Sequence, residues 1–586
     1  MAQTTLPTLA SIVRAATGLG ARVSRWQQRR RASPLWTAAV AAIAGLMVLP
    51  IATLLVLAAA PSDNIWPHLA TTVLPRAVRD TALLMIGVGG TCLVVGTGTA
   101  WLVTMYRFPG RGLIDRLLVL PLAMPTYIVA YAYVEILDAA GPLQTALRDL
   151  TGAVTARDLW FPQIRSLGGA VFLMAMVLYP YVYLTARASF VQQSVCALEV
   201  ARTLGRTPIG VFWAVALPLA RPAIAAGVAL VLMETLNDIG AVQYLGVETL
   251  TASVYATWLQ RSNLGGAAQL ATVMMVLIVA LFVAERVARG RAEAHHTTGR
   301  YRSIPFQDLD GVAGIAAAAC CLLPFVLGFL VPFSVLAGNA FFYFMPAIKA
   351  GFVTAAINSL LLAATAAAAA AGLAIVLGYA RRVAANGFIR PAVRIAGLGY
   401  AIPGTVLALG LMIPLATFDN WLDGLARGSL GMSTGLLLSG SVFALVIAYT
   451  IRFLAVALGS VEAGLERISP NLDAAARALG ETPMSALWRV HLPLLMPATA
   501  SAALLVFVDA MKELPATLLL RPFNFETLAT HVYSFAALER FEDAALGALM
   551  IVAVGLVPVL LLHRAVATGR AGSGSGDRTS KGWSGA

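Results

Sequence analysis

The chain has 586 residues, of which 59% are hydrophobic and only 12% are charged. Soluble globular chains carry about 25% charged residues, so this composition excludes an ordinary soluble domain. Repeated apolar runs of about 20 residues match the thickness of a bilayer, and uninterrupted runs predict helices rather than barrel strands. The net charge of +13 does not indicate nucleic acid, because the basic residues fall between the apolar runs, where they orient a membrane protein. We therefore expect an all-α polytopic membrane protein.

The four cysteines predict neither a disulfide framework nor a metal centre. Cys92, Cys320 and Cys321 lie in apolar runs, and Cys196 directly precedes a polar loop. The chain has no CxxC pair and no Cys/His spacing typical of a metal site. We expect these side chains to act as small hydrophobic fillers, and the sequence leaves any metal site unassigned.

Twelve membrane spans are predicted in chain order. An arginine-rich segment, 1–35, precedes an apolar run from Trp36 to about Ala60. This run exceeds the apolar region of a signal peptide, which is about 7–15 residues long, so we expect an uncleaved first helix. The further spans are expected near 81–106, 116–138, 167–189, 218–240, 264–286, 312–338, 358–380, 394–415, 435–458, 494–519 and 542–563.

The spans form two sets of six. We expect a first half over 36–286, a polar connector over 287–311, a second half over 312–565 and a flexible Gly/Ser-rich tail over 566–586. Twelve spans place both termini on one side. With that side inside, the cytoplasmic loops collect most of the arginines between spans, although several remain in the outer loops.

An internal repeat relates the two halves. Asp80-Thr81 matches Asn358-Ser359, Ala123-Met-Pro125 matches Ala401-Ile-Pro403, and Glu248-Thr-Leu250 matches Glu526-Thr-Leu528, each at an offset of 278 residues. Because both copies have the same orientation, we expect a parallel repeat about an axis along the membrane normal. Two such halves would line one central path.

A polar loop occurs once in each half, over 198–218 and 472–493. The first reads Leu198-Glu-Val-Ala-Arg-Thr-Leu-Gly205, then nine residues, then Val215-Ala-Leu-Pro218. The second reads Leu472-Asp-Ala-Ala-Ala-Arg-Ala-Leu-Gly480, then nine residues, then Val490-His-Leu-Pro493. Small residues such as Ala201 and Ala475 keep a helix slim, and Gly205 and Gly480 suit a left-handed C-terminal turn. Pro218 and Pro493 are expected to begin the next membrane helix.

This paired pattern resembles the EAA loop of ABC-importer permeases. The resemblance implies a short cytoplasmic coupling helix in each half, docked on one of two copies of a separate ABC ATPase. It also implies the inner membrane of a bacterium, cytoplasmic termini and a periplasmic substrate-binding protein at the outer face. The chain has no phosphate-binding GxxxxGK[ST] loop, so ATP and Mg belong to the ATPase and this chain is expected to bind no cofactor. One departure is Glu199, which has Ala474 at its place in the second loop, with Asp473 one residue earlier.

Polar residues follow each loop at membrane depth, namely Glu234, Asn237 and Asp238 in the first half and Asp509, Lys512 and Glu513 in the second. Charges at this depth face a cavity or a partner. Carboxylates four residues apart share a helical face, so two acidic faces lining a translocation path for a small, highly charged cation are one hypothesis. The other is structural, with Lys512 pairing with Asp509 or with an acid of the other half and holding broken helix ends together. Pro125 and Pro403 interrupt two equivalent helices, as gate hinges or as simple kinks.

From about residue 75 to 565 the chain is most similar to the fused permeases of ferric-iron ABC importers. Met233-Glu-Thr-Leu-Asn-Asp238, Met511-Lys-Glu-Leu-Pro-Ala-Thr517 and Arg521-Pro-Phe-Asn-Phe-Glu-Thr-Leu528 carry this resemblance. It implies an ATP-driven, binding-protein-dependent importer that works by alternating access. Thiamine and 2-aminoethylphosphonate permeases look similar and remain alternatives. An ATP-independent secondary transporter is an alternative of another class, whereas a membrane enzyme lacks any nucleophile–base or metal constellation.

Overall fold

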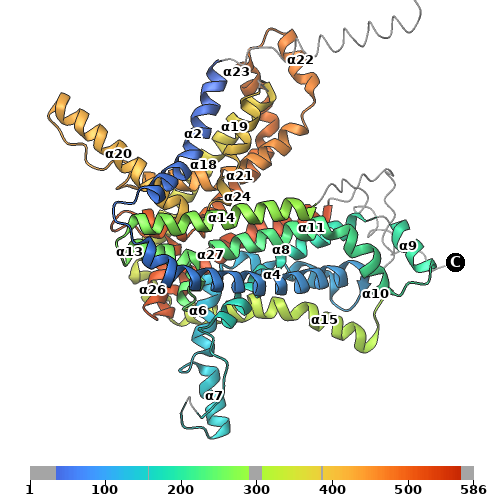
Figure 1. Cartoon of the computed structure of the whole chain (residues 1–586). Coiled ribbons are helices and arrows are strands. Elements are labelled where there is room, and N and C mark those ends of the chain that lie inside the picture. Colours follow the sequence, from blue (N-terminus) through green and yellow to red (C-terminus); the bar gives the residue numbers. More distant parts are fainter. Residues whose placement is uncertain (1–33, 156–157, 194, 290–306, 384–386, 569–586) are drawn as a thin grey trace, which may run out of the picture. The chain divides into compact units, whose positions relative to one another are not determined.

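The structure is a computed structural model that describes residues 34–155, 158–193, 195–289, 307–383 and 387–568 (Figure 1). The predicted N-terminal segment, connector and tail therefore lie mostly outside the described residues. Within them, eleven helices are long and apolar enough to cross a membrane, and a pair bent by 95°, Arg111–Ala123 with Thr126–Thr151, raises the number to twelve. The predicted all-α polytopic fold is confirmed.

The first half by sequence contains helices α2 (Pro34–Ala59), α3 (Trp66–His68), η1 (Leu69–Val73), α4 (Leu74–Met105), α5 (Arg111–Leu117), η2 (Leu120–Ala123), α6 (Thr126–Leu137), α7 (Pro142–Thr151), α8 (Leu167–Gln192), α9 (Val195–Thr203), α10 (Pro208–Val211), η3 (Phe212–Ala216), α11 (Leu217–Asn237), α12 (Gly240–Tyr244), α13 (Leu250–Leu259) and α14 (Leu264–Arg289).

The second half contains α15 (Gly311–Phe325), η4 (Val326–Leu330), α16 (Val331–Phe342), α17 (Phe344–Ala347), η5 (Ile348–Phe352), α18 (Val353–Val383), α19 (Ile389–Ala396), η6 (Gly399–Ala401), α20 (Gly404–Leu430), α21 (Val442–Glu466), α22 (Pro470–Ala478), α23 (Pro483–Ala486), η7 (Leu487–His491), α24 (Leu492–Met511), α25 (Pro515–Leu520), α26 (Leu528–Ala537) and α27 (Phe541–Thr568). Strands β1 (Tyr106–Arg107) and β2 (Gln307–Asp308) form one short parallel pair.

The described residues form two compact units that do not coincide with the two sequence halves. The small unit comprises the described part of Met1–Ile51 with Ala364–Ile402 and Tyr449–Phe507, and the large unit comprises the rest. A compact unit reflects packing, whereas the predicted halves follow a sequence repeat. The predicted domain boundaries therefore stay a prediction.

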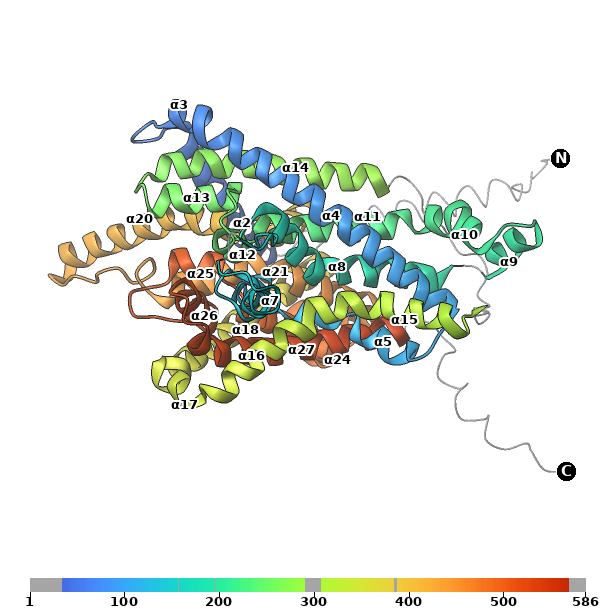
Figure 2. The same ribbon diagram turned by 90° about the horizontal axis from the view of Figure 1, so that it is seen from below.

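In the large unit, α4, α8 and α11 pack on one another and lie side by side in Figures 1 and 2. Gly96 permits this approach, because a Cβ there would lie 2.9 Å from the carbonyl oxygen of Tyr179. Helices of the second half join this bundle. A Cβ on Gly328 of η4 would lie 2.1 Å from the carbonyl oxygen of Met176 in α8, and the Tyr133 hydroxyl donates to the carbonyl of Leu327 at 2.6 Å. The sequence halves thus interlock within one core.

In the small unit, α2, α18, α21 and α24 supply the packed helices. Trp36 of α2 meets Tyr379 of α18 edge-on, with ring centroids 5.5 Å apart. Gly464 of α21 faces α24, where a Cβ on that glycine would lie 2.6 Å from the Cβ of Ala498. These contacts position the end of α18 beside the second polar loop.

The internal repeat appears as matching hydrogen bonds in the large unit. The buried Thr81 hydroxyl accepts the backbone N–H of Leu250 at 2.9 Å, and the buried Ser359 hydroxyl accepts that of Leu528 at 2.6 Å. Both leucines are the first residues of helices, α13 and α26, whose N–H groups lack intrahelical partners. The hydroxyl groups at these matched positions therefore accept the same N-terminal helix N–H in both halves.

Four prolines in the described membrane helices follow widened π turns. Turns η1, η3, η4 and η7 are each followed directly by a residue and then a proline, and that residue donates its N–H to the carbonyl five positions earlier. The wider turn leaves room for the proline ring, which has no N–H and clashes with an ordinary helix. As expected, Pro218 and Pro493 are the second residues of α11 and α24. The whole helical spans begin ten residues earlier, at Pro208 and Pro483, each capped by a preceding threonine hydroxyl.

The predicted breaks at Pro125 and Pro403 are present. Each proline is the N-cap of the following helix, with ψ of 142° and 143°, and each follows a short 3₁₀ turn, η2 or η6. The extended conformation at these prolines ends one helical segment and starts another. Whether the breaks act as gates stays a prediction.

Candidate functional site

The two polar loops have the same backbone structure. A short helix, α9 or α22, ends at a glycine with φ of 81° at Gly205 and 82° at Gly480. Each glycine donates to the carbonyl three residues before it, and the residue after it donates to the carbonyl five before that one, at 2.9–3.1 Å. This pair of bonds is a Schellman motif, which requires the left-handed conformation that glycine adopts freely. The left-handed turn predicted at both glycines is confirmed.

The alanines of the loops differ in exposure. Ala201 and its counterpart Ala476 are buried, which keeps each short helix close to its own membrane domain, whereas Ala475 is exposed. Glu199 is half-buried and forms no hydrogen bond or ion pair with other described residues. The second loop has Ala474 at this place.

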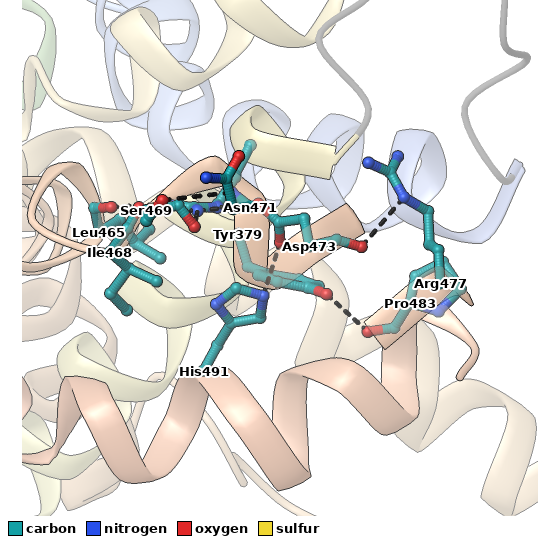
Figure 3. Close-up of polar contacts among 10 residues, drawn as sticks. Tyr379, Leu465, Ile468, Ser469, Asn471, Asp473, Arg477, Pro483 and His491 are labelled. Carbon is teal, nitrogen blue, oxygen red and sulfur yellow. Dashed lines mark hydrogen bonds and ion pairs between the residues drawn. The ribbon is translucent and has the colours of Figure 1, made fainter. Parts of the chain in front are cut away.

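The second loop is fixed by a charged network, drawn in Figure 3. Asp473 of α22 lies 2.8 Å from Arg382 of α18 and 2.7 Å from Nε2 of the fully buried His491 in η7. The Tyr379 hydroxyl donates to the carbonyl of Pro483 at 2.7 Å, and Arg477 donates to the carbonyl of Asp473 at 3.0 Å. Asp473 was a candidate contact for the ATPase, but its carboxylate points into its own unit.

A cavity of about 270 Å³ lies beside this network, lined among others by Tyr379, Arg382, Asp473, Arg477 and Glu481. Hydrogen bonds from the Ser485 hydroxyl and then from Arg489 hold the pKa of Glu481 below its usual range. Both acids of the cavity are thus neutralised from within the unit. Arg477 is exposed, so the mouth of the cavity carries a positive charge.

Among the described residues, the first loop shows no counterpart of this network. At the equivalent offsets, Thr104 stands for Arg382, Leu198 for Asp473 and Ala216 for His491. Helix α9 instead packs on α10 and η3. Phe212 of η3 packs against Trp101, and the centroids of the two rings lie 5.0 Å apart. The described contacts of the first loop are therefore packing contacts, whereas those of the second loop include ion pairs.

The polar residues predicted at membrane depth, here called the polar membrane cluster, are Glu234, Asn237, Asp238, Asp509, Lys512 and Glu513. Two of its carboxylates cap helices. Helix α11 ends at Asn237, and Asp238 leaves the helix with ψ of 127°. One oxygen of Asp238 accepts the N–H of Ala241 at 2.8 Å, at the start of α12, and the other accepts the hydroxyl of Thr126 at the start of α6. Similarly, α24 ends at Met511, and Glu513 accepts the N–H of Ala516 in α25 at 3.1 Å. The expected helical faces Glu234/Asp238 and Asp509/Glu513 are therefore wrong, because a helix break separates the members of each pair.

The remaining members of the cluster lie near one another in the large unit. Lys512 pairs with Asp509 at 2.9 Å and also interacts electrostatically with Glu234 of the first half. The two breaks touch, since a Cβ on Gly240 would lie 2.8 Å from the side chain of Leu514. Asn237 is buried. These contacts favour the structural interpretation, in which the cluster holds broken helix ends together.

The geometry includes residues that the sequence reasoning did not single out, namely Arg382, His491 and Thr126. A comparison of the two halves at fixed offsets could have identified Arg382 and His491, because each is a large polar residue whose counterpart in the first half is apolar or small. Among the described residues, no group of three His, Cys, Asp or Glu side chains is arranged to hold a metal ion.

Comparisons with known proteins show similarity to membrane transport permeases. Residues 93–289 match the family model described as "Binding-protein-dependent transport system inner membrane component". The Fe(3+)-transport system permease protein FbpB 2 of Haemophilus influenzae is 26% identical over 505 residues, which cover 83% of this chain and 89% of that protein.

Shorter permeases align with one part of the chain. The putative 2-aminoethylphosphonate transport system permease protein PhnU of Salmonella paratyphi A is 32% identical over 37% of this chain and 74% of its own length. The molybdenum transport system permease protein ModB of Escherichia coli is 30% identical over 34% of this chain and 86% of its own length. With its two EAA-like loops and its membrane helices, the chain belongs to the inner-membrane permease family of binding-protein-dependent ABC importers.

Proposed function

We propose that this permease imports ferric iron. The observation that carries the proposal is the extent of the similarity to the Fe(3+)-transport permease, which spans 83% of this chain and therefore both repeats. The similarity to the 2-aminoethylphosphonate permease covers 37% of the chain, so it supports the second candidate less well. A periplasmic binding protein would deliver the ion to the outer face.

Two copies of a separate ATPase would dock on α9 and α22. Both short helices end in the same glycine-capped turn, so they present similar shapes to similar partners. ATP binding would close the ATPases and move both helices, and the membrane helices would alternate between inward- and outward-open states. This arrangement places both loops and both termini in the cytoplasm of a bacterium, with the chain in the inner membrane.

The polar membrane cluster would hold the broken helix ends together and would not form a tight resting site for the ion. Its carboxylates are already occupied by helix N–H groups, a hydroxyl and Lys512. A ferric ion passing this point would meet no ready-made set of free oxygen ligands, and slow release from a strong site is avoided. Selectivity is then assigned to the binding protein.

Reconstitution tests the proposal. Liposomes would contain this chain, its ATPase and its binding protein, and uptake and ATP hydrolysis would be measured with ferric iron, thiamine and 2-aminoethylphosphonate. We expect ATP-dependent uptake of iron alone, lost when the ATPase is omitted. Uptake of another substrate would remove iron and keep the importer, and uptake without ATPase would indicate a secondary transporter.

A further inference from the structure

The Arg382 guanidinium joins three helical segments of the small unit. It lies 2.8 Å from Asp473 of α22, and it donates to the carbonyls of Leu465 at 2.6 Å, Ile468 at 2.9 Å and Ser469 at 3.3 Å. These carbonyls lie at the end of α21 and in the turn before α22, where helix carbonyls lack intrahelical partners and carry partial negative charge. Only 16% of the Arg382 side chain is exposed.

Asp473 extends this connection to a fourth segment. Its second carboxylate oxygen lies 2.7 Å from His491, in the π turn that leads into α24. The short helix α22 is therefore attached to the ends of α18, α21 and α24 through one carboxylate and one guanidinium. A planar guanidinium with five donors suits such a junction, whereas a lysine offers a single point charge.

We propose that Arg382 is a positioning residue that transmits movement of the second coupling helix to the membrane helices, a role for which the first half has no counterpart. The inference rests on the proposed function of α22 as an ATPase-docking helix. When α22 moves, Asp473 moves with it, and the short charge-assisted bonds carry α18 and the end of α21 along. In the first half, Thr104 and Leu198 offer no such bond, so α9 acts through chain continuity and packing on η3.

The test compares two adjacent arginines. Arg382→Met removes the junction, whereas Arg381→Met removes the same charge from an exposed pair with Glu462, whose atoms lie 2.5 Å apart at 44% exposure of the arginine. Each variant is reconstituted with the ATPase and the binding protein, and substrate uptake per ATP hydrolysed is measured. We expect this ratio to fall about tenfold for Arg382→Met, within the range of measured coupling free energies, and to change less than about twofold for Arg381→Met.

A double variant separates transmission from folding. Arg382→Thr with Asp473→Leu installs the residues of the first half and leaves neither charge without its ion-pair partner, so it is expected to be destabilised less than Arg382→Met. The proposal expects uptake per ATP to stay low in this folded variant. Wild-type uptake per ATP in either Arg382→Met or the double variant overturns it.

The outcome is independent of which substrate is carried. The ratio is measured with whichever member of the panel the wild-type protein transports, so a substrate other than iron changes the proposed function and leaves this comparison valid. Uptake that needs no ATPase would remove the docking role of α22, and with it the transmission role of Arg382.

Discussion

The two polar loops share a backbone conformation and differ in the contacts that attach them to neighbouring helices. Both helices end in a Schellman motif at a glycine with φ near 81°, and both membrane helices that follow begin at a threonine-capped proline and pass through a π turn. In the second loop, Asp473 is held by Arg382 and His491, while the first loop relies on packing. The two loops therefore have the same backbone conformation, although different side-chain contacts attach them to the neighbouring helices.

The acidic residues of the two loops also differ in their contacts. Glu199 forms no hydrogen bond or ion pair with other described residues, whereas Asp473, one position before the equivalent site, pairs with Arg382 inside its own unit. The presence of an acid in this motif therefore does not by itself show what the acid contacts.

The largest expected effect comes from breaking the network in the second loop. Asp473→Leu leaves the mostly buried Arg382 without its carboxylate, and we expect a loss of about 2–3 kcal/mol in stability, below the range for fully buried pairs because of partial exposure. Thermal unfolding in detergent measures this. Glu462→Leu, which removes the acid of an exposed pair, should cost about 0.5 kcal/mol. Equal losses would mean that the network is no stronger than a surface pair.

Next in size are the hydroxyls that tie the repeats together. Thr81→Val and Ser359→Ala each leave a buried backbone N–H, of Leu250 or Leu528, without its acceptor, at a cost of about 1–2 kcal/mol. The two variants should lower the unfolding temperature by similar amounts, because the contact is the same in each half. A large effect in one half only would show that the repeat is preserved in sequence and not in energetics.

The glycine caps should also behave alike. Gly205→Ala and Gly480→Ala force an alanine into the left-handed region, at a cost of about 1 kcal/mol each, and no atom lies near enough to add a clash. Thermal unfolding of both variants checks this. Gly210→Ala, which lies in an ordinary helical turn of α10, serves as a control and should not be destabilising by this mechanism.

The smallest effect concerns pH. The second loop has Glu481 where the first has Arg206. Because bonds from Ser485 and Arg489 lower the pKa of Glu481, its ionised form contributes stability above the usual glutamate pKa, and this contribution is lost as pH falls through the lowered pKa. The difference in unfolding temperature between wild type and Glu481→Gln should therefore be greatest near neutral pH and vanish in acid. If the difference in unfolding temperature grew in acid, the pKa of Glu481 would be raised in the folded protein, which would contradict this prediction.

Much of the fold was predictable because apolar runs, turn residues and the repeat are local signals. The spans, the proline breaks and both glycine caps follow from run length and residue type alone. The helix ends at Asn237 and Met511 were not predictable from hydropathy, because apolar residues continue on both sides of each break. Asp238 and Glu513 take their roles from N–H groups that become available only when the chain turns there.

The partners of the candidate residues were less predictable. Arg382 lies 91 positions from Asp473, and nothing in the sequence around either residue indicates the pairing. Lys512 and Asp509 are only three positions apart, on either side of the end of α24, so their pairing could be expected from the sequence and is confirmed.

The interlocking of the sequence halves has a consequence for synthesis. The hydrogen bond from Tyr133 to Leu327 can form only after Leu327 has been synthesised, 194 residues later in the chain. At a synthesis rate of about 5–20 residues per second, that interval lasts roughly 10–40 s. During this time the remaining spans of the first half are still being made, and the places of η4 and α16 stay vacant. An insertion factor that holds early helices until later ones arrive would bridge this interval, and a chain cut in the connector would have to be assembled from two pieces made together.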